Sequence, residues 1–312
     1  MKFVGQIAVA LLAGCSFTAA FGADPYPVKP VRMIVGFAPG GGTDLTARPV
    51  AQVIVENRPG AAGNVATEQV AKSAPDGYTL LMGTIAALAI NPSLYGNLRF
   101  DPETDLAPVI QVVDATNVLA LHPSVPASSV KELIALAREK SLLAGSSGIG
   151  ATGHLAIELF NLMAGVKLVH VPYKGGGPAM ADLVGGQVNL IFATTASAIP
   201  HLKSGRIKGI AVTTAKRSAL LPDLPTVSEA GLEGFDANNW YGLVVPAKTP
   251  RAIIDQLNAE VSKVLAMPDV KTTLFNQGLD PAPGTPEQFG AYIKSERAKW
   301  AKVIKESGAK PE

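Results

Sequence analysis

The stretch LLAGSSGIGATGHLAIELFNLM, residues 142–163, is the part of the sequence that decides the fold. A short strand is expected over Leu142–Ser146, and the apolar residues of Thr152–Met163 recur at helical spacing. The turn between the two elements contains Gly148 and Gly150. A strand that passes through a glycine-rich turn into a helix is the repeating unit of α/β proteins, so this class is expected here.

The same alternation continues along the chain on both sides of this stretch. Strands are expected at Val31–Phe37, Val53–Glu56, Tyr78–Gly83, Leu106–Val113, Asn117–His122, Leu142–Ser146, Lys167–Val171, Val188–Phe192, Ile207–Thr214 and Trp240–Val245. Helices are expected after Thr43 and at Ala62–Ala74, Val130–Glu139, Thr152–Met163, Pro178–Val184, Ala196–Lys203, Pro250–Leu265, Val270–Gln277 and Pro286–Lys305. Such alternation predicts mostly parallel sheets that are flanked by helices.

The length of 312 residues is enough for two such units. One set of strands and helices lies before residue 120, and a second set lies between residues 121 and 239. The strand at Trp240–Val245 would return the chain to the first unit and give the C-terminal helices a sheet to cover. We therefore expect a discontinuous first lobe, 24–120 and 240–312, hinged to a second lobe, 121–239. Two sequential domains are the alternative.

The N-terminus has the pattern of a secretory signal peptide, residues 1–23. Met1-Lys2 is followed by an apolar run, Phe3–Gly14, which is shorter than the roughly 20 residues needed to span a membrane. Leu12-Ala13-Gly14-Cys15 also resembles a lipobox, and a lipoprotein anchored through Cys15 is the alternative. The only cysteine is Cys15, so the mature chain would contain no disulfide. A periplasmic, exported protein is expected.

Three glycine-rich segments lie between an expected strand and an expected helix: 37–44, 146–154 and 173–178. Without Cβ atoms, successive backbone N–H groups can converge on an anion, and the helix N-terminus adds partial positive charge. The hydroxyls of Thr43, Ser147 and Thr152 would add donors. Because ligands of open α/β sheets bind where helices begin, the three segments predict a cleft for a carboxylate or a phosphate.

Other kinds of site are not supported by the sequence. Gly148-x-Gly150-x-x-Gly153 matches the bare dinucleotide pattern, but no acidic residue ends the following strand, so no cofactor is expected. The net charge of +2, spread over scattered basic residues, argues against nucleic acid as a partner.

Catalytic and metal-binding patterns are also missing. The four histidines form no metal-ligand spacing, and there is no Gly-x-Ser-x-Gly elbow, so neither a metal site nor an enzyme is expected. Asp44 lies in a first helical turn, where a carboxylate is favoured by capping and by the dipole. His154, beside Thr152, either shapes the cleft or has a local capping or packing role.

Several motifs together give the chain a resemblance to a known family. They are Tyr26–Pro30, Gly40–Asp44, Val55–Asn64, Ala74–Leu80, Asn91–Tyr95, Val171–Gly176, Gly185–Val188, Leu224–Gly231 and Trp240–Leu243. In this order they resemble the periplasmic receptors of tripartite tricarboxylate transporters, the Bug-type extracytoplasmic solute receptors. The resemblance implies a two-lobed type II periplasmic-binding-protein fold that closes like a Venus flytrap on a small carboxylate.

The resemblance also implies how the ligand is held and which partners the protein has. Family members bind mainly through backbone N–H groups, hydroxyls and bridging waters. Carried over to this sequence, the ligand-binding residues are Phe37, Gly41, Thr43, Thr84, Ser147, Gly150, Thr152, Ala193, Thr194 and Thr195. The implied partners are a small organic acid and the permease subunits of a tripartite transporter or, as an alternative, the ectodomain of a sensor kinase. A monomer is expected.

Two departures from the family pattern affect the functional expectation. Ala193 stands where the family often has an aspartate, which favours a simple organic acid over a ligand with an amine. The segment between Gln52 and Val53 is short by roughly two helical turns, and Pro49 interrupts the helix before it. A strained or rebuilt crossover would follow. A non-binding relic of a receptor is the alternative that the shortened helix suggests. A periplasmic α/β hydrolase or transferase is a separate alternative.

Overall fold

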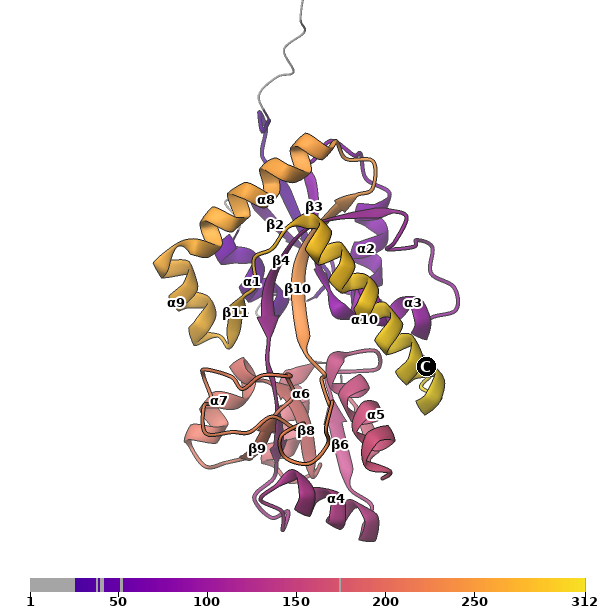
Figure 1. Ribbon diagram of the computed structural model, residues 1–312, viewed down its shortest axis with the longest axis vertical. Coiled ribbons are helices and arrows are strands. Elements are labelled where there is room, and N and C mark those ends of the chain that lie inside the picture. The colour runs from indigo at the N-terminus through magenta and orange to yellow at the C-terminus, as the bar shows by residue number, and fades with distance from the viewer. Residues whose placement is uncertain (1–25, 38, 40–41, 51–52, 174, 312) are drawn as a thin grey trace, which may run out of the picture.

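The computed structural model describes residues 26–37, 39, 42–50, 53–173 and 175–311. Figure 1 shows two lobes, one above the other, and each lobe contains a sheet flanked by helices. The expected signal peptide, with Cys15, lies outside these residues. Within them, no helix is both long enough and apolar enough to cross a membrane.

The sheet of the first lobe has six strands in the order β11-β4-β10-β3-β1-β2. Their bounds are β1 Arg32–Val35, β2 Ile54–Asn57, β3 Thr79–Thr84, β4 Leu106–Ala115, β10 Asn239–Pro246 and β11 Leu279–Pro281. Strand β1 is parallel to β2 and β3, whereas β10 is antiparallel to β3 and β4, and β11 is antiparallel to β4. Strands β1 to β4 therefore run one way, and the strands that arrive from the second lobe or follow it run the other way.

The sheet of the second lobe has five strands in the order β7-β6-β8-β5-β9. Their bounds are β5 Asn117–Leu121, β6 Leu143–Ser146, β7 Val169–Pro172, β8 Leu190–Thr194 and β9 Lys208–Val212. Strand β5 is antiparallel to β8 and β9, and β6 is parallel to β7 and β8, so only β5 opposes the others. The expectation of two lobes, each with a sheet flanked by helices, is confirmed, and both sheets combine parallel and antiparallel strand pairs. Residues 117–120, expected in the first lobe, belong to this second sheet.

Helices cover both faces of each sheet, which explains why central strands such as β10 are buried along their whole length. On the first sheet, α2 (Asn64–Ala71) and α10 (Pro286–Ser307) cover one face, and α1 (Gly42–Val50), α8 (Arg251–Ala266) and α9 (Pro268–Asn276) cover the other. Alternate residues of β1 divide between these two clusters: Ile34 packs with the first set, and Met33 and Val35 pack with the second.

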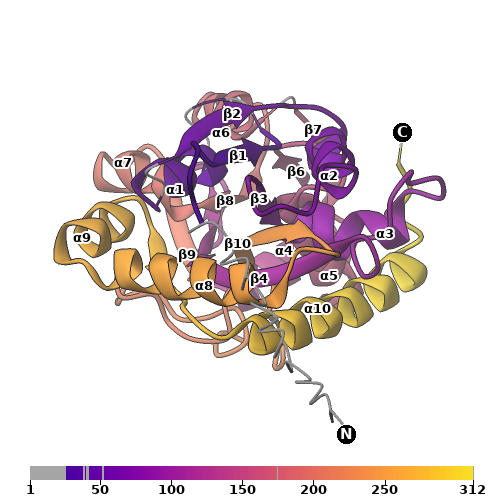
Figure 2. The same ribbon diagram turned by 90° about the horizontal axis from the view of Figure 1, so that it is seen from above.

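The second sheet is covered in the same way. Helices α4 (Val130–Glu139) and α5 (Thr152–Ala164) pack on one face, and α6 (Gly176–Val184) and α7 (Thr195–Lys203) pack on the other. In Figure 2 the second lobe lies beneath the first, and α10 runs along the side of the molecule to the C-terminus. Helix α10 contacts α5, so it links the two lobes.

Three short elements were not expected from the sequence. A single π-helical segment, Ala86–Ile90, follows β3 and leads into α3, Asn91–Leu94. The third is β11, Leu279–Pro281. The helix expected at 62–74 is also shorter, because Ala61 and Ala62 have positive φ angles of 45° and 51° before α2 begins. These features depend on tertiary contacts that single-residue preferences do not report.

The crossover between β1 and β2, expected to be strained or rebuilt, contains helix α1. Helix α1 ends at Val50, one residue after Pro49. Ala47 and Val50 are buried in the cluster that includes α8 and α9. Pro49 lies in the last turn of the helix, where it removes the hydrogen bond that a backbone N–H would give to the carbonyl four residues earlier, and the helix ends one residue later. Strand β2 still pairs in parallel with β1.

The lobes are also joined by a buried group of hydrogen bonds around Thr195, which we call the interlobe contact. The backbone N–H of Thr195 donates to Thr116 O at 3.0 Å, and its hydroxyl lies 3.1 Å from both Thr116 O and Gly278 O. Gly278 has a φ of 73°, and a Cβ at this position would lie 2.0 Å from Thr195 Oγ1. Only glycine fits this contact between the lobes.

Gly278→Ala is expected to lower the free energy of unfolding by about 3 kcal/mol or more, because it adds a clash to an unfavourable φ. Gly205→Ala is the matched control, since Gly205 has a φ of 68° but no atom within 4 Å of the added Cβ. The control is expected to cost about 1 kcal/mol. Urea denaturation measures both values, and equal losses of unfolding free energy in the two variants would contradict the importance of the interlobe contact.

Candidate functional site

The strand register places the carboxyl ends of parallel strands from both lobes at the junction between the sheets. Thr84, the last residue of β3, pairs with Tyr241, and Thr194, the last residue of β8, pairs with Asn117. Asn117 begins β5 immediately after Thr116, where the chain leaves β4. Both threonines therefore lie at the end of their sheet that faces the other lobe, where ligands of open α/β sheets bind.

Four helices begin at this junction. Helices α1, α5, α6 and α7 follow β1, β6, β7 and β8, and their first residues are Gly42, Thr152, Gly176 and Thr195. Each N-terminus carries a partial positive charge and N–H groups without a partner inside the helix, although the Thr195 N–H of α7 donates to Thr116 O. The junction therefore favours an anion without requiring an arginine or lysine.

In the first lobe, the buried hydroxyl of Tyr241 organises the start of α1. Asn239 Nδ2 donates to Tyr241 Oη at 3.1 Å, and the Thr43 hydroxyl is also hydrogen-bonded to the phenol. Burial raises the pKa of Tyr241, so the phenol keeps its own proton at neutral pH. Sequence reasoning missed Tyr241, because only the pairing of β10 with β3 brings it beside the first glycine loop.

The other expected residues of the first lobe have defined places, except Gly41, which is not described. Thr84 is buried, and its hydroxyl accepts a long hydrogen bond, 3.4 Å, from the Ala87 N–H. The Phe37 ring packs near Gly63, and its carbonyl accepts from Asn57 Nδ2 at 2.9 Å. Thr43 lies on helix α1 and Thr84 on strand β3, and both lie next to Tyr241 of β10 at one side of the junction.

Asp44 ties the first glycine loop to the sheet. Its carboxylate accepts two hydrogen bonds from Arg48, both at 2.9 Å, and one from Asn57 Nδ2 at 2.9 Å. The same Asn57 amide holds the Phe37 carbonyl. The pairing supports a structural role for Asp44 within α1 and its loop.

In the second lobe, two of the expected hydroxyls have no hydrogen-bond partner among the described residues. Ser147 is exposed just beyond β6, and Thr152 is partly exposed at the first position of α5. Thr194 Oγ1 lies 3.1 Å from Ser197 Oγ. These groups come from two adjacent strand ends, and Ser147 and Thr152 are the ones most open to a ligand.

Three expected residues are committed to the protein itself. Thr195 is fully buried in the interlobe contact, and Ala193 packs in the hydrophobic cluster that contains Met180. The Gly150 N–H donates to His154 Nδ1 at 3.2 Å. These three residues shape the second-lobe side of the junction rather than offering free donors to it.

The loop 147–151 lies against the first lobe. A Cβ on Gly150 would lie 3.1 Å from Leu94 Cδ2 and 3.2 Å from Asn91 Oδ1, both in α3. Asn91 is fully buried; its Nδ2 donates to Asn64 Oδ1 at 2.7 Å, whereas its Oδ1 has no partner among the described residues. Asn91 is a second residue that sequence reasoning missed, because its position follows from the unexpected π-helical segment.

A serine–histidine contact is also present, although the sequence did not suggest one. Ser146 Oγ lies 2.6 Å from His170 Nε2. Ser146 is buried at 3% exposure, and its hydroxyl is also bonded to Gly148. Burial and the neighbouring His154 lower the pKa of His170 to about 4, which makes it a poor base at neutral pH. The pair is built to hold a loop and not to attack a substrate.

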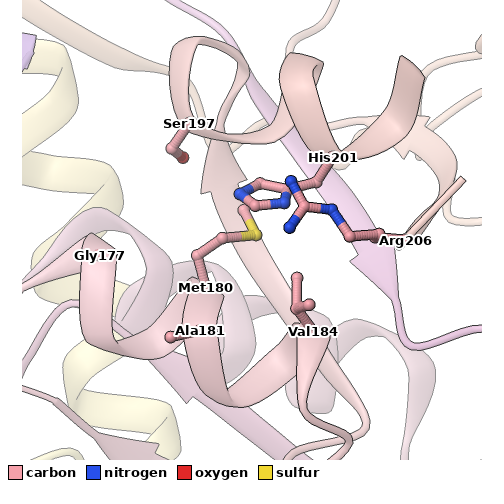
Figure 3. Close-up of a pocket in the computed structure, with 7 residues that line it drawn as sticks. All are labelled: Gly177, Met180, Ala181, Val184, Ser197, His201 and Arg206. Atoms are coloured by element: carbon pink, nitrogen blue, oxygen red, sulfur yellow. The ribbon is translucent and has the colours of Figure 1, made fainter. Parts of the chain in front are cut away.

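A hollow of about 410 Å³ lies elsewhere, between α6 and α7 on the second lobe (Figure 3). Met180 and Val184 of α6 face His201 of α7 across it, and Arg206 lies beside the histidine. Burial and the nearby Arg206 lower the pKa of His201. None of the expected ligand-binding residues lines this hollow, so it is distinct from the junction.

Close to the junction, near the end of β4, the carboxylate of Asp114 has an altered pKa. Burial, together with the nearby Asp280 and Asp236, raises the pKa of Asp114 to about 6, although the hydrogen bonds from Asn238 and Gln111 act to lower it. Both amides donate to the same oxygen, Oδ1, at 2.7 and 2.8 Å. The folded state therefore holds this proton more tightly than the unfolded chain does.

Asp114→Asn is expected to increase stability at pH 7.5 and to have little effect at pH 4. The raised pKa means that the wild type loses stability as the pH rises from about 4 to about 6. The asparagine Oδ1 can accept both amide bonds and does not ionise, so the gain is about 2 kcal/mol after allowance for partial exposure.

Urea denaturation across this pH range measures the difference between the two proteins. Asp223→Asn, at an exposed position, is the control and is expected to change stability by less than about 0.5 kcal/mol at either pH. A constant difference between Asp114→Asn and the wild type would contradict the assignment.

Comparison with known proteins agrees with this geometry. The model of the family described as "Tripartite tricarboxylate transporter family receptor" matches residues 43–309. The chain is 37% identical to protein BugT of Bordetella pertussis, over 96% of this chain and 95% of that protein.

Two solved structures are also similar. Rpa4515 of R. palustris, solved with adipate, is 38% identical with a TM-score of 0.85, over 92% of this chain and 100% of that one. MatC from Rhodopseudomonas palustris, solved with bound malate, is 31% identical with a TM-score of 0.80, over 89% and 100% of the two chains.

The fold defines the class of protein, which is a two-lobed solute-binding protein. The chain belongs to the tripartite tricarboxylate transporter receptor family. It is a solute receptor rather than an enzyme, and receptors of this family are periplasmic.

Proposed function

We propose that this receptor binds a small dicarboxylate between its lobes and delivers it to the membrane subunits of a tripartite transporter. The observation that supports the proposal is that four helices, α1, α5, α6 and α7, each begin after a strand that ends toward the junction. Backbone N–H groups and hydroxyls can compensate a carboxylate there, and the expected ligand-binding residues include no arginine or lysine.

The proposed ligand-binding residues come from both lobes. They are Phe37, Gly41, Thr43 and Thr84 in the first lobe and Ser147, Gly150, Thr152, Ala193, Thr194 and Thr195 in the second. Ser147 and Thr152 would donate hydroxyls, since both are accessible and without a partner among described residues. Thr195, Ala193 and Gly150 would act by fixing the shape of the site.

A dicarboxylate fits the two-sided arrangement better than a single acid. Helix α1 begins on one side of the junction and α5 and α7 begin on the other, so each lobe can receive one carboxylate. The neutral Ala193 leaves no negative charge on β8 to attract an amine. Two similar receptors have been solved with adipate and malate, which are both dicarboxylates.

Binding would close the lobes about the segments that cross between them. We propose residues 24–116 and 239–312 as one moving unit and 117–238 as the other, which adjusts the boundary expected at residue 120 to the start of β5. The crossings at Thr116 and Asn239 then lie side by side, since Asn239 pairs with Ala115. Such paired crossings are suited to a hinge.

Titration calorimetry with adipate, malate, citrate and benzoate tests the proposal. At least one dicarboxylate is expected to bind, and at a hundredfold excess over its Kd it would add about 2.7 kcal/mol to stability in a thermal melt. Benzoate, with a single carboxylate, is expected to bind more weakly. The absence of heat and of a melting shift with every acid would overturn the proposed function.

Ser147→Ala is expected to weaken binding of the best acid by about fivefold to tenfold, because one hydrogen bond to a charged oxygen is lost. Ser141→Ala is the matched control: Ser141 is also exposed but lies before the amino end of β6, away from the junction. Calorimetry measures both affinities. The two variants should melt like the wild type, and equal affinities would exclude Ser147 from the site.

A further inference from the structure

A compact polar cluster lies directly beneath loop 147–151, and we call it the histidine cluster. It consists of Ser146 at the end of β6, His170 on β7, and His154 and Glu158 on α5. The two imidazole rings are stacked, with centroids 4.2 Å apart and an interplanar angle of 16°. His154 and Ser146 are buried, with exposures of 5% and 3%.

The cluster determines the backbone path of the loop. The Gly150 N–H donates to His154 Nδ1, so the proton of the neutral ring is on Nε2, which lies 3.6 Å from Glu158 Oε1. Ser146 Oγ accepts from the Gly148 N–H at 3.1 Å and is itself held by His170. Both glycines have positive φ angles, 133° and 77°, which glycine adopts without strain, and the two side chains hold their N–H groups in this conformation.

The surroundings of the cluster disfavour a positive charge on the His170 ring. Burial lowers the pKa of His170 to about 4, the adjacent His154 lowers it as well, and Glu158 acts in the opposite direction. Strands β6 and β8 contribute no ionisable side chain. Helix α10 packs against α5, and Glu296 and Lys299 on it pair with each other.

We propose that His154 is a positioning residue for ligand binding: it holds loop 147–151 in the binding conformation only while its Nδ1 is unprotonated, so acidification releases the loop and weakens binding. The proposal rests on the proposed function for the role of the loop. A proton on Nδ1 takes the lone pair that accepts the Gly150 N–H, and two N–H groups would then face each other. The charged ring would also lie against His170, and the Gly150 contact with α3 would loosen.

Substitutions at His154 separate acceptance of the hydrogen bond from titration. In His154→Asn, the side-chain oxygen can occupy the Nδ1 position and accept from Gly150, but it does not titrate. In His154→Gln, the longer side chain places its amide near the Nε2 position, which leaves Gly150 without an acceptor. A melt of each variant at pH 7 shows whether it is folded.

The first measurement needs no ligand: hydrogen exchange of the Gly150 amide at pH 7 and pH 4.5. Protection in the wild type, divided by that in His154→Asn at the same pH, is expected to fall about tenfold on acidification. His154→Gln should be poorly protected at both pH values. A ratio that does not change with pH would overturn the proposal.

The second measurement is the affinity for adipate and malate of the wild type and His154→Asn at the same two pH values. Taking the ratio at each pH cancels the protonation of the acid itself, and the wild type is expected to lose about tenfold relative to the variant. A constant affinity ratio would overturn the positioning role even if the acids bind. If no acid binds but the Gly150 protection changes as expected, the proposed function fails, and the effect of His154 on the loop stands.

If neither variant folds, nitrogen NMR of the wild type decides. The His154 ring nitrogens and the Gly150 amide should then titrate with one midpoint, and different midpoints would overturn the proposal.

Discussion

The passage of strand β10 through the first sheet is the constraint on which the rest of the structure depends. It lies between β3 and β4, is buried at every position, and gives the C-terminal helices a sheet to cover. The packing is close: a Cβ on Gly242 would lie 2.2 Å from the Phe289 ring of α10. The same strand places Tyr241 beside Thr84 and Asn239 beside Ala115, so one pairing sets both the core and the junction.

The anion site proposed at the junction relies on backbone geometry. Helix N-termini and hydroxyls supply fixed dipoles that cost no additional buried charge, whereas a buried arginine would need a partner in the empty state. The ionisable groups close to the junction act on the protein itself. Asp44 pairs with Arg48, and Asp114 is held by two amides. A ligand that leaves therefore exposes no unpaired buried charge among these groups.

The histidine cluster shows how a receptor can contain a serine–histidine contact without catalysis. The hydroxyl of Ser146 is buried and bonded to Gly148, and the low pKa of His170 leaves little basicity. The cluster fixes the shape of loop 147–151. The neutral His154 imidazole accepts the Gly150 N–H, and the Ser146 hydroxyl accepts the Gly148 N–H.

Local patterns in the sequence determined most of the helices and strands, the glycine loops and the absence of catalytic motifs, because periodicity and turn residues act over a few positions. The π-helical segment, α3 and β11 lacked such a signal. Only the tertiary structure decided which polar groups are free: the Thr195 hydroxyl is taken by Gly278, 83 residues away, and Ser146 meets His170, 24 residues away. Such pairings follow from strand register, which depends on the packing of the whole sheet.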